Sequence, residues 1–327
     1  SKKKLVVMLP FQLNNVVSDT LNTDEKGGVI YVDDFEGTTS ELDIRSPVNG
    51  PNGWVLASTP QGQTENGMFP EGVLSNDIGN GMNRARLAWY IIDPLFYRNN
   101  NLTPSHLSSA DRSLSYSREV LEQEIFPNKQ SQLANQQTNL PMFDVAFYPK
   151  EKGPYNYDAT GETPSGQNVA AGLEPDGSLK DPESRWGGLM RPITTSEFES
   201  NNIEFIQFWM MDPFHEDVGN SHTGGDLYFN LGNVSEDILR DGQKSFENGL
   251  PTPTNDNPFS STNQAIVSDV QNIINVFDND PTSRPFQDIG FDGMNDEQER
   301  VFHAGVNGYV EKLNALTLNQ AAYDRLI

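Results

Sequence analysis

The chain of 327 residues contains no cysteine and only 4 histidines. The absence of cysteine excludes disulfide bonds, zinc-thiolate sites and thiol nucleophiles. No apolar run reaches the roughly 18 residues that a membrane-spanning helix needs. Lys2, Lys3 and Lys4 precede a short apolar run at 5–9, which imitates a signal peptide. That run is too short and no small-residue cleavage site follows, so we expect a strand here, or the cut edge of a longer chain.

Basic residues are scarce: 22 lysines and arginines face 46 acidic residues, for a formal net charge of −24. Such a surface repels phosphate backbones and anionic headgroups, which disfavours nucleic acid as a partner. It suits a cation or a basic protein, and the alternative is that the charge serves solubility alone. The low hydrophobic fraction of 35%, with 27 glycines and 21 prolines, predicts many turns and long loops.

Apolar or alternating runs predict strands in six places. The run 203–211 is apolar on both faces, so we expect a central strand covered from two sides, with Trp209 in the core as we also expect for Trp89. The run 226–231 alternates cleanly and predicts a half-buried antiparallel strand. The six runs are 29–35, 54–58, 85–92, 143–148, 203–211 and 226–231.

Helical patterns gather toward the end of the chain. We expect a short helix capped by Ser235, another beginning at Ser268, and a third over 296–316. Strand-rich sequence followed by helices predicts a mainly β fold, an antiparallel, jelly-roll-like β-sandwich with long loops and a few C-terminal helices. The expected division is an unassigned segment 1–28, the sandwich 29–241, a linker-like loop 242–265, and a helical segment 266–327.

The sharpest local motif, at 288–299, follows much of an EF-hand calcium loop. Asp288, Asp292, Asp296 and Glu299 stand at positions where carboxylates bind the ion, and Met294 stands where a backbone carbonyl does. Gly293 permits the sharp turn, but Gly290 replaces an expected ligand. The motif therefore predicts a weakened Ca²⁺ site. The alternative is an ordinary Asp-Gly turn before a helix that begins with acidic residues.

Other candidate sites are weaker. A carboxylate group at 33–36 suits either a structural cation or turn capping, and the four histidines are scattered. No nucleophile elbow or complete dinucleotide fingerprint occurs, so we do not expect an enzyme. Trp186, flanked by Arg185 and Arg191, fits a protein-docking hot spot. The equal alternative is that Trp186 anchors its long loop to the core.

Several blocks taken together are similar to a section of one known family. These blocks are 29–37 (VIYVDDFEG), 45–47 (RSP), 54–62 (WVLASTPQG), 84–97 (RARLAWYIIDPLFY), 152–157 (KGPYNY), 181–191 (DPESRWGGLMR), 198–213, 225–237 and 287–299. They resemble the SprA/Sov family, the giant outer-membrane translocon of the type IX secretion system in Bacteroidota. The likeness fades before 28, through 99–140 and beyond 305.

The resemblance implies a non-catalytic structural and interaction segment of a protein-export machine that is also linked to gliding motility. It implies other type IX subunits and secreted cargo as partners, at the outer membrane. Insertions of outer-membrane barrels normally lie outside the cell, so we expect the extracellular side, with the periplasmic side as alternative. A different reading of the residues is a calcium-stabilised, jelly-roll carbohydrate-binding module with exposed tryptophans.

Overall fold

The computed structural model describes the backbone of residues 3–8 and most of the chain from 53 onward. The described ranges are 3–8, 53–63, 67–128, 139–140, 142–193, 208–212, 214, 224–243, 259–268, 279–282, 292–305 and 308–326. Within them the strands are short and pair antiparallel, and the helices are short. At this level the expectation of an antiparallel, mainly β chain is confirmed.

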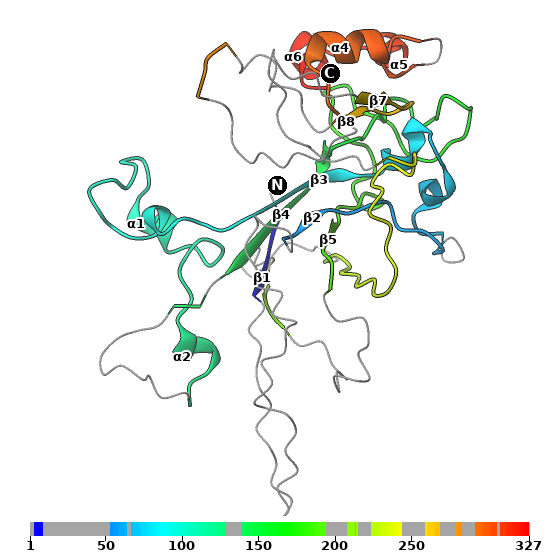
Figure 1. Ribbon diagram of the computed structural model, residues 1–327. Helices are drawn as coiled ribbons and strands as arrows, with labels where there is room; N and C mark the ends of the chain where they lie inside the picture. Colours follow the sequence, from blue (N-terminus) through cyan, green and yellow to red (C-terminus); the bar gives the residue numbers. More distant parts are fainter. Residues whose placement is uncertain are drawn as a thin grey trace, which may run out of the picture.

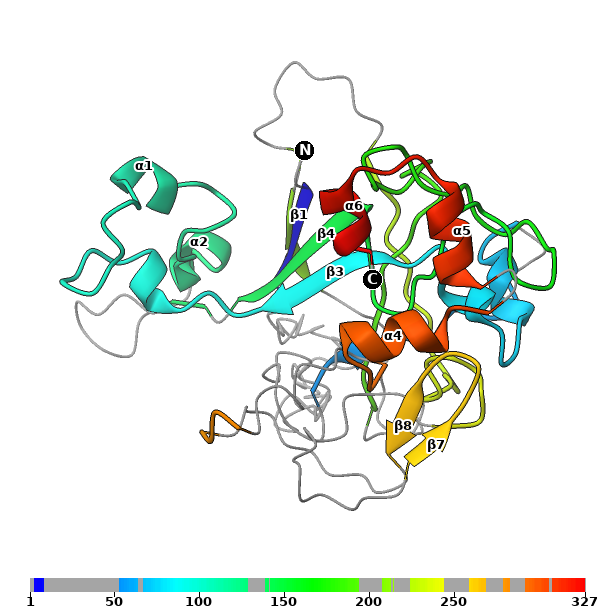
Figure 2. The same cartoon turned by 90° about the horizontal axis from the view of Figure 1, so that it is seen from above.

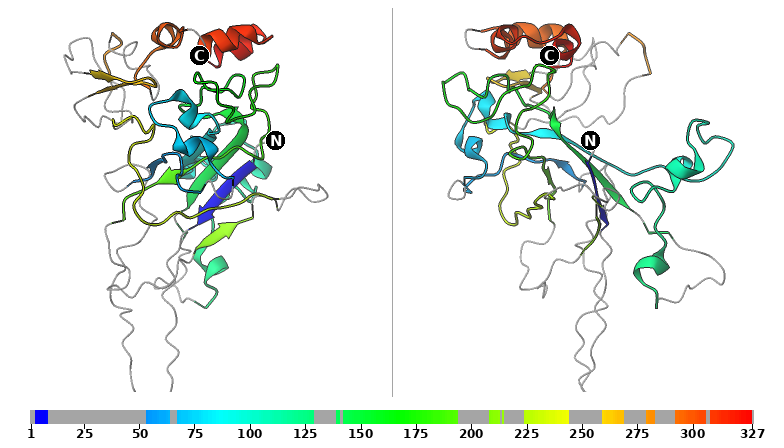
Figure 3. Two further views of the ribbon diagram at one scale, coloured as in Figure 1. Left: turned by 90° about the vertical axis from the view of Figure 1, so that its right-hand side faces the viewer. Right: turned by 180° about the vertical axis from the view of Figure 1, so that it is seen from behind.

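The largest sheet has four strands in the order β3-β4-β1-β6 (Figures 1 and 3). They are β1 (Lys3–Met8), β3 (Ala85–Tyr90), β4 (Phe143–Lys152) and β6 (Trp209–Met211). β4 lies between two neighbours, and its first four residues are all buried. This explains why a run with little alternation, Phe143 to Ala146, forms this strand: both of its faces are covered. The strands expected at 85–92 and 143–148 are thus confirmed, and β4 continues to Lys152.

Two small sheets accompany the first. β2 (Val55–Leu56) pairs with β5 (Leu189–Met190), as part of the strand expected at 54–58, and β7 (Phe259–Ser261) pairs with β8 (Ile266–Ser268). The α-helices are α1 (Ser109–Arg112), α2 (Glu122–Ile125), α4 (Asp296–Phe302), α5 (Tyr309–Ala315) and α6 (Gln320–Asp324). Short 3₁₀ turns lie at Pro70–Val73, Ile78–Gly81 and Pro94–Phe96. Within the described ranges, none of the helices has the length and apolar character needed to cross a bilayer.

The helices lie at two separate places (Figure 2). α1 and α2 belong to an arm that projects away from the large sheet, whereas α4, α5 and α6 lie together at the other end of the molecule. The C-terminal helices pack on loops that follow β4, because Leu173 and Leu179 share one buried cluster with Tyr309, Leu313 and Leu326. The expected helical segment 266–327 is therefore joined to the rest by apolar packing.

A buried polar network holds the loops on either side of the sheet together. Arg84 is fully buried and donates to the carbonyl oxygens of Pro154 (3.2 Å) and Ala57 (3.1 Å). Glu71 is equally buried and accepts from Asn83 Nδ2 at 2.9 Å. Buried polar groups cost several kcal/mol unless they are paired. These bonds pair Arg84 and Glu71 with groups from several loops, and so hold those loops together.

Two strand expectations are wrong in part. The segment 226–231 belongs to no described strand, and Leu227, Phe229 and Leu231 are exposed rather than half-buried. Trp209 is also exposed, at 45%, because β6 has only β1 as a described neighbour. The expectation of a central strand covered from two sides is therefore wrong for 209–211. The first part of that run, 203–207, and the expected strand 29–35 lie outside the described residues.

The helix expectations also change. No helix follows Ser235, whose hydroxyl accepts from the Asp237 N–H at 3.2 Å within an irregular bend. The single helix expected over 296–316 is two helices, α4 and α5. Gly308 caps the start of α5, where a Cβ atom would lie 2.5 Å from the His303 carbonyl oxygen. This close approach requires glycine and is incompatible with a continuous helix. The helix expected from Ser268 lies outside the described residues.

Candidate functional site

The end of β4 brings a lysine to the C-terminal helices. Lys152 Nζ donates to the Leu326 carbonyl oxygen at 2.7 Å, and it lies 4.5 Å and 5.4 Å from the ring centres of Tyr309 and Tyr157. The two rings attract the ammonium group and exclude water from it. Burial lowers the pKa of Lys152 to about 8. The lysine thus joins the sheet to the last helix through charge as well as packing.

Two carboxyl groups lie beside this lysine. Asp292 accepts from Tyr157 Oη (3.2 Å) and from the Met294 N–H (3.1 Å), and the Glu299 side chain on α4 lies close enough to influence its ionisation. Burial raises the pKa of both carboxyls, and with the charge of Asp292 it brings that of Glu299 to about 7. Two neighbouring buried carboxyl groups resist being ionised together, because burial and their like charges both disfavour it. The pair therefore holds a proton near neutral pH.

His303 completes the cluster at the end of α4. Its ring lies 4.4 Å from the ring centre of Tyr157, and its buried Nε2 has no hydrogen-bond partner within the described part of the chain. Burial, and then the nearby charge of Lys152, lower the pKa of His303 to about 4. The imidazole is neutral at physiological pH. The cluster of Lys152, Asp292, Glu299 and His303 is the densest group of perturbed ionisable residues that the structure describes.

The predicted calcium loop overlaps this cluster. Asp292 and Glu299 lie together, and Gly293 has φ 78° where a Cβ atom would meet the Ile266 carbonyl oxygen at 2.1 Å. Asp296 is exposed in the first turn of α4, and Asp288 lies outside the described residues. Met294 contributes its N–H to Asp292. In the described ranges, no three His, Asp or Glu side chains are grouped so as to hold a metal ion. Calcium binding stays a prediction.

Adding Ca²⁺ is expected to raise the thermal unfolding midpoint if the loop binds it. A site with a dissociation constant of about 10⁻⁴ M, held at about 100 times that concentration, stabilises the folded state by about 2.7 kcal/mol. Melting the protein in Ca²⁺ and in chelator measures this directly. The same Mg²⁺ concentration controls for ionic strength, and E297Q controls for loss of one carboxylate at a position of the motif that is not an expected ligand. Equal midpoints in Ca²⁺ and in chelator would show that the prediction of Ca²⁺ binding is wrong.

The residues predicted to dock a partner are largely built into the fold. Arg185 is buried and forms an ion pair with Asp158 at 2.9 Å, with both side chains 0% exposed. Half-buried Trp186 donates its Nε1–H to Glu71 at 2.8 Å. The Arg84 guanidinium lies over the Trp186 ring, 5.0 Å from the ring centre. Arg191 lies over the ring of Trp54 at 5.7 Å. This geometry corresponds to the loop-anchoring alternative, and partner binding by these three residues stays a prediction.

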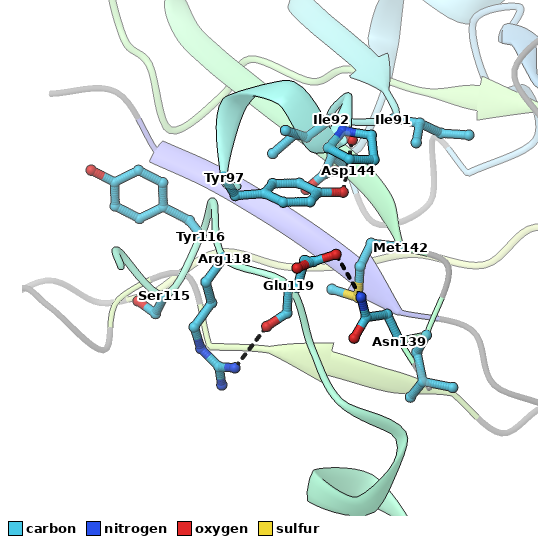
Figure 4. A pocket seen from close by; sticks show the side chains of 12 residues that line it. Ile91, Ile92, Tyr97, Ser115, Tyr116, Arg118, Glu119, Asn139, Met142 and Asp144 are labelled. Carbon is cyan, nitrogen blue, oxygen red and sulfur yellow. Dashed lines mark hydrogen bonds between the residues drawn. The ribbon is translucent and has the colours of Figure 1, made fainter. Parts of the chain in front are cut away.

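A small cavity of about 140 Å³ lies where the arm with α1 and α2 joins the sheet (Figure 4). Glu119 is drawn beside it, but its Oε1 already accepts from Arg98 Nη2 and Asn139 Nδ2, both at 2.5 Å. Tyr97 Oη donates to the Ile92 carbonyl oxygen at 2.9 Å. Small-molecule sites usually measure about 300 Å³ or more. These polar groups therefore hold the arm in place.

Sequence reasoning missed Lys152, Tyr157 and His303. Lys152 and Tyr157 belong to one of the resembling blocks, 152–157, but no local pattern gives them a role. Lys152 and Glu299 are far apart in sequence, and only tertiary packing brings them together. One signal lies in the sequence: Lys152 is a charged residue that follows an expected strand and begins the aromatic run KGPYNY. Comparisons with known protein families and with curated proteins find no match to the chain.

Proposed function

We propose that the chain is a non-catalytic structural and interaction segment of a type IX secretion translocon, with a role in protein export across the outer membrane and in gliding motility. The resemblance of nine blocks to the SprA/Sov family supports this proposal. The acidic surface and the long loops are compatible with contact to several proteins. We place the segment on the extracellular side of the outer membrane, with the periplasmic side as the alternative.

One observation carries the interaction role: seven large apolar side chains are exposed in two neighbouring segments. We call them the exposed apolar strip, and its members are Trp209, Met210, Leu227, Tyr228, Phe229, Leu231 and Val234. The two segments touch, because the rings of Phe208 and Phe229 lie 5.2 Å apart. Exposed apolar side chains gathered in neighbouring segments are typical of interaction sites in folded proteins. We infer that other translocon subunits or secreted cargo cover the strip.

The test is affinity capture from a detergent extract of outer membranes that contain a type IX system. The full chain should enrich type IX subunits or cargo, as measured by quantitative mass spectrometry. A matched bait, L227S/L231S, should lose most of that enrichment because it keeps the fold and removes two exposed members of the strip. Equal recovery by both baits, or recovery of no type IX component, would count against the proposal.

A second candidate is the calcium-stabilised carbohydrate-binding module with a jelly-roll-like sandwich. The exposed indole of Trp209 favours it, because sugar binders present aromatic faces to solvent. Calorimetry against a glycan panel distinguishes the two functions. A sugar binder should give measurable heat that W209A abolishes, whereas the translocon segment should give none.

A further inference from the structure

We infer that 225–234 is a latent β-strand, which an extended, basic segment of a different polypeptide completes by pairing with it through main-chain hydrogen bonds. The inference rests on the proposed function, because it names the chemistry of a partner for the exposed apolar strip. It also accounts for the disagreement between sequence and structure at 226–231. The sequence there has the pattern of a strand, but in the structure the segment pairs with no described strand.

The side chains of this segment are those of a strand that lacks its cover. Leu227, Phe229 and Leu231 alternate with Tyr228 and Asn230, and their exposed fractions are 42%, 51% and 54%. Removing apolar surface from water is favourable in proportion to the area covered. Covering the exposed parts of the three side chains together therefore favours an association. Random surface sequence does not place its apolar residues at every second position.

The backbone of the segment is equally available. Among the described residues, no backbone hydrogen bond joins 225–234 to another segment. Backbone without such bonds has N–H and C=O groups that an incoming strand can pair with, once the segment adopts the strand conformation that its sequence pattern predicts. Its position is nevertheless fixed, since Gln63 Nε2 donates to Asn230 Oδ1 at 2.6 Å and Ser58 Oγ donates to the Ser235 carbonyl oxygen at 2.9 Å. A segment that is already tethered at two points loses less entropy on pairing.

Strand β6 widens the surface for the partner. Its described neighbour is β1 alone, so it lies at the sheet edge of the described strands. The contact between Phe208 and Phe229 brings it beside the latent strand, and Trp209 and Met210 are 45% and 44% exposed. The partner's apolar side chains can therefore lie on aromatic and thioether groups from β6 while its backbone pairs with 225–234.

The charge of the surface selects the occupant. Asp212, Asp226 and Glu236 are exposed around the strip, and the whole chain carries −24. A second copy of the chain would bring the same negative charge to the interface, which opposes association. A partner segment with lysine or arginine between its apolar residues satisfies both the charge and the alternation. These arguments favour a basic foreign strand over self-pairing.

The experiment uses the full chain and a fluorescein-labelled peptide of five Lys-Val repeats, at about 0.15 M salt to limit unspecific charge effects. Anisotropy measures binding, and hydrogen exchange with mass spectrometry locates it. We expect the peptide to slow exchange of the amides in 225–234 by about tenfold or more at saturation. A Glu-Val peptide of equal length should not bind.

Backbone pairing is separated from apolar adsorption by two matched pairs of variants. Y228P and L231P remove N–H groups that face opposite edges of a strand, whereas Y228T and L231T keep them. At one of the two positions, proline should weaken binding at least about tenfold more than threonine. Both sites are exposed, and circular dichroism checks the fold of each of the four variants.

Equal weakening by proline and threonine at both positions would overturn strand pairing, as would unchanged exchange with saturating peptide. A concentration-dependent dimer that protects the same amides would assign the strand to a second copy instead. The proposed function fails separately: if the peptide pairs as expected but the membrane extract yields no type IX component, the latent strand stands and the translocon assignment falls.

Discussion

Replacing Arg185 with alanine should lower the free energy of unfolding by about 3–5 kcal/mol, as measured by urea denaturation. The guanidinium group binds Asp158 and donates to the carbonyl oxygens of Met82 (2.8 Å), Lys180 (2.9 Å) and Gly172 (3.2 Å). Without it, the fully buried Asp158 carboxylate keeps only the N–H groups of Gly161 and Gly172 and has no positive charge beside it, and three carbonyl groups lose this donor. An uncompensated buried charge is among the costliest defects that one substitution can create.

Arg86→Ala is the matched control. Arg86 also forms an ion pair at 2.9 Å, with Glu151, but the two side chains are 60% and 46% exposed. Water and salt screen an exposed pair, so R86A should cost less than about 1 kcal/mol. Losses of similar size in R185A and R86A would show that burial does not decide the strength of the Arg185 pair.

Replacing Glu299 with glutamine should stabilise the protein at pH 8 by up to about 3 kcal/mol and leave its stability at pH 4 nearly unchanged. Burial and the charge of Asp292 raise the pKa of Glu299 from 4.5 to about 7 in the folded state. A raised carboxyl pKa favours folding below pH 4.5, and that contribution is lost as the pH rises to 7. Glutamine carries no charge, so it avoids this loss.

The measurement is the difference in unfolding free energy between variant and parent at pH 4, 6 and 8. The separate effect of His303, whose neutral form is lost toward pH 4, is the same in both proteins and cancels. E297Q, at an exposed carboxylate on the same helix, removes the same charge without the burial. A constant difference across the pH range, or equal behaviour of E299Q and E297Q, contradicts the shared-proton pair.

The sequence predicts β3 and β4 well because their apolar residues pack within this chain. It predicts 226–231 equally clearly as a strand, yet no described strand pairs with it. An alternating pattern shows that a face is meant to be covered, but it does not show by which chain. The break between α4 and α5 depends on a contact between Gly308 and the His303 carbonyl, which a helical pattern cannot reveal.

The candidate site is predicted only in its local part. The sequence predicts that Asp292, on a turn, and Glu299, on the helix that follows, lie close together. The structure does bring them together. Lys152 comes from a strand that is distant in sequence. It places a positive charge beside the two carboxyl groups, so the buried cluster contains charges of both signs. Trp186 shows the same limit, because its bond to Glu71 depends on a loop more than a hundred residues earlier.

The strand order of the large sheet has a consequence for synthesis on the ribosome. β1 pairs with β4, and Val7 lies opposite Phe143, so the first strand must wait for well over a hundred further residues to be translated. At about 5–20 residues per second, this delay is on the order of ten seconds. During that time Leu5–Met8 lacks β4 and β6, the two strands with which it pairs in the described part of the chain. A chaperone that holds apolar segments should therefore be needed early in the life of this protein.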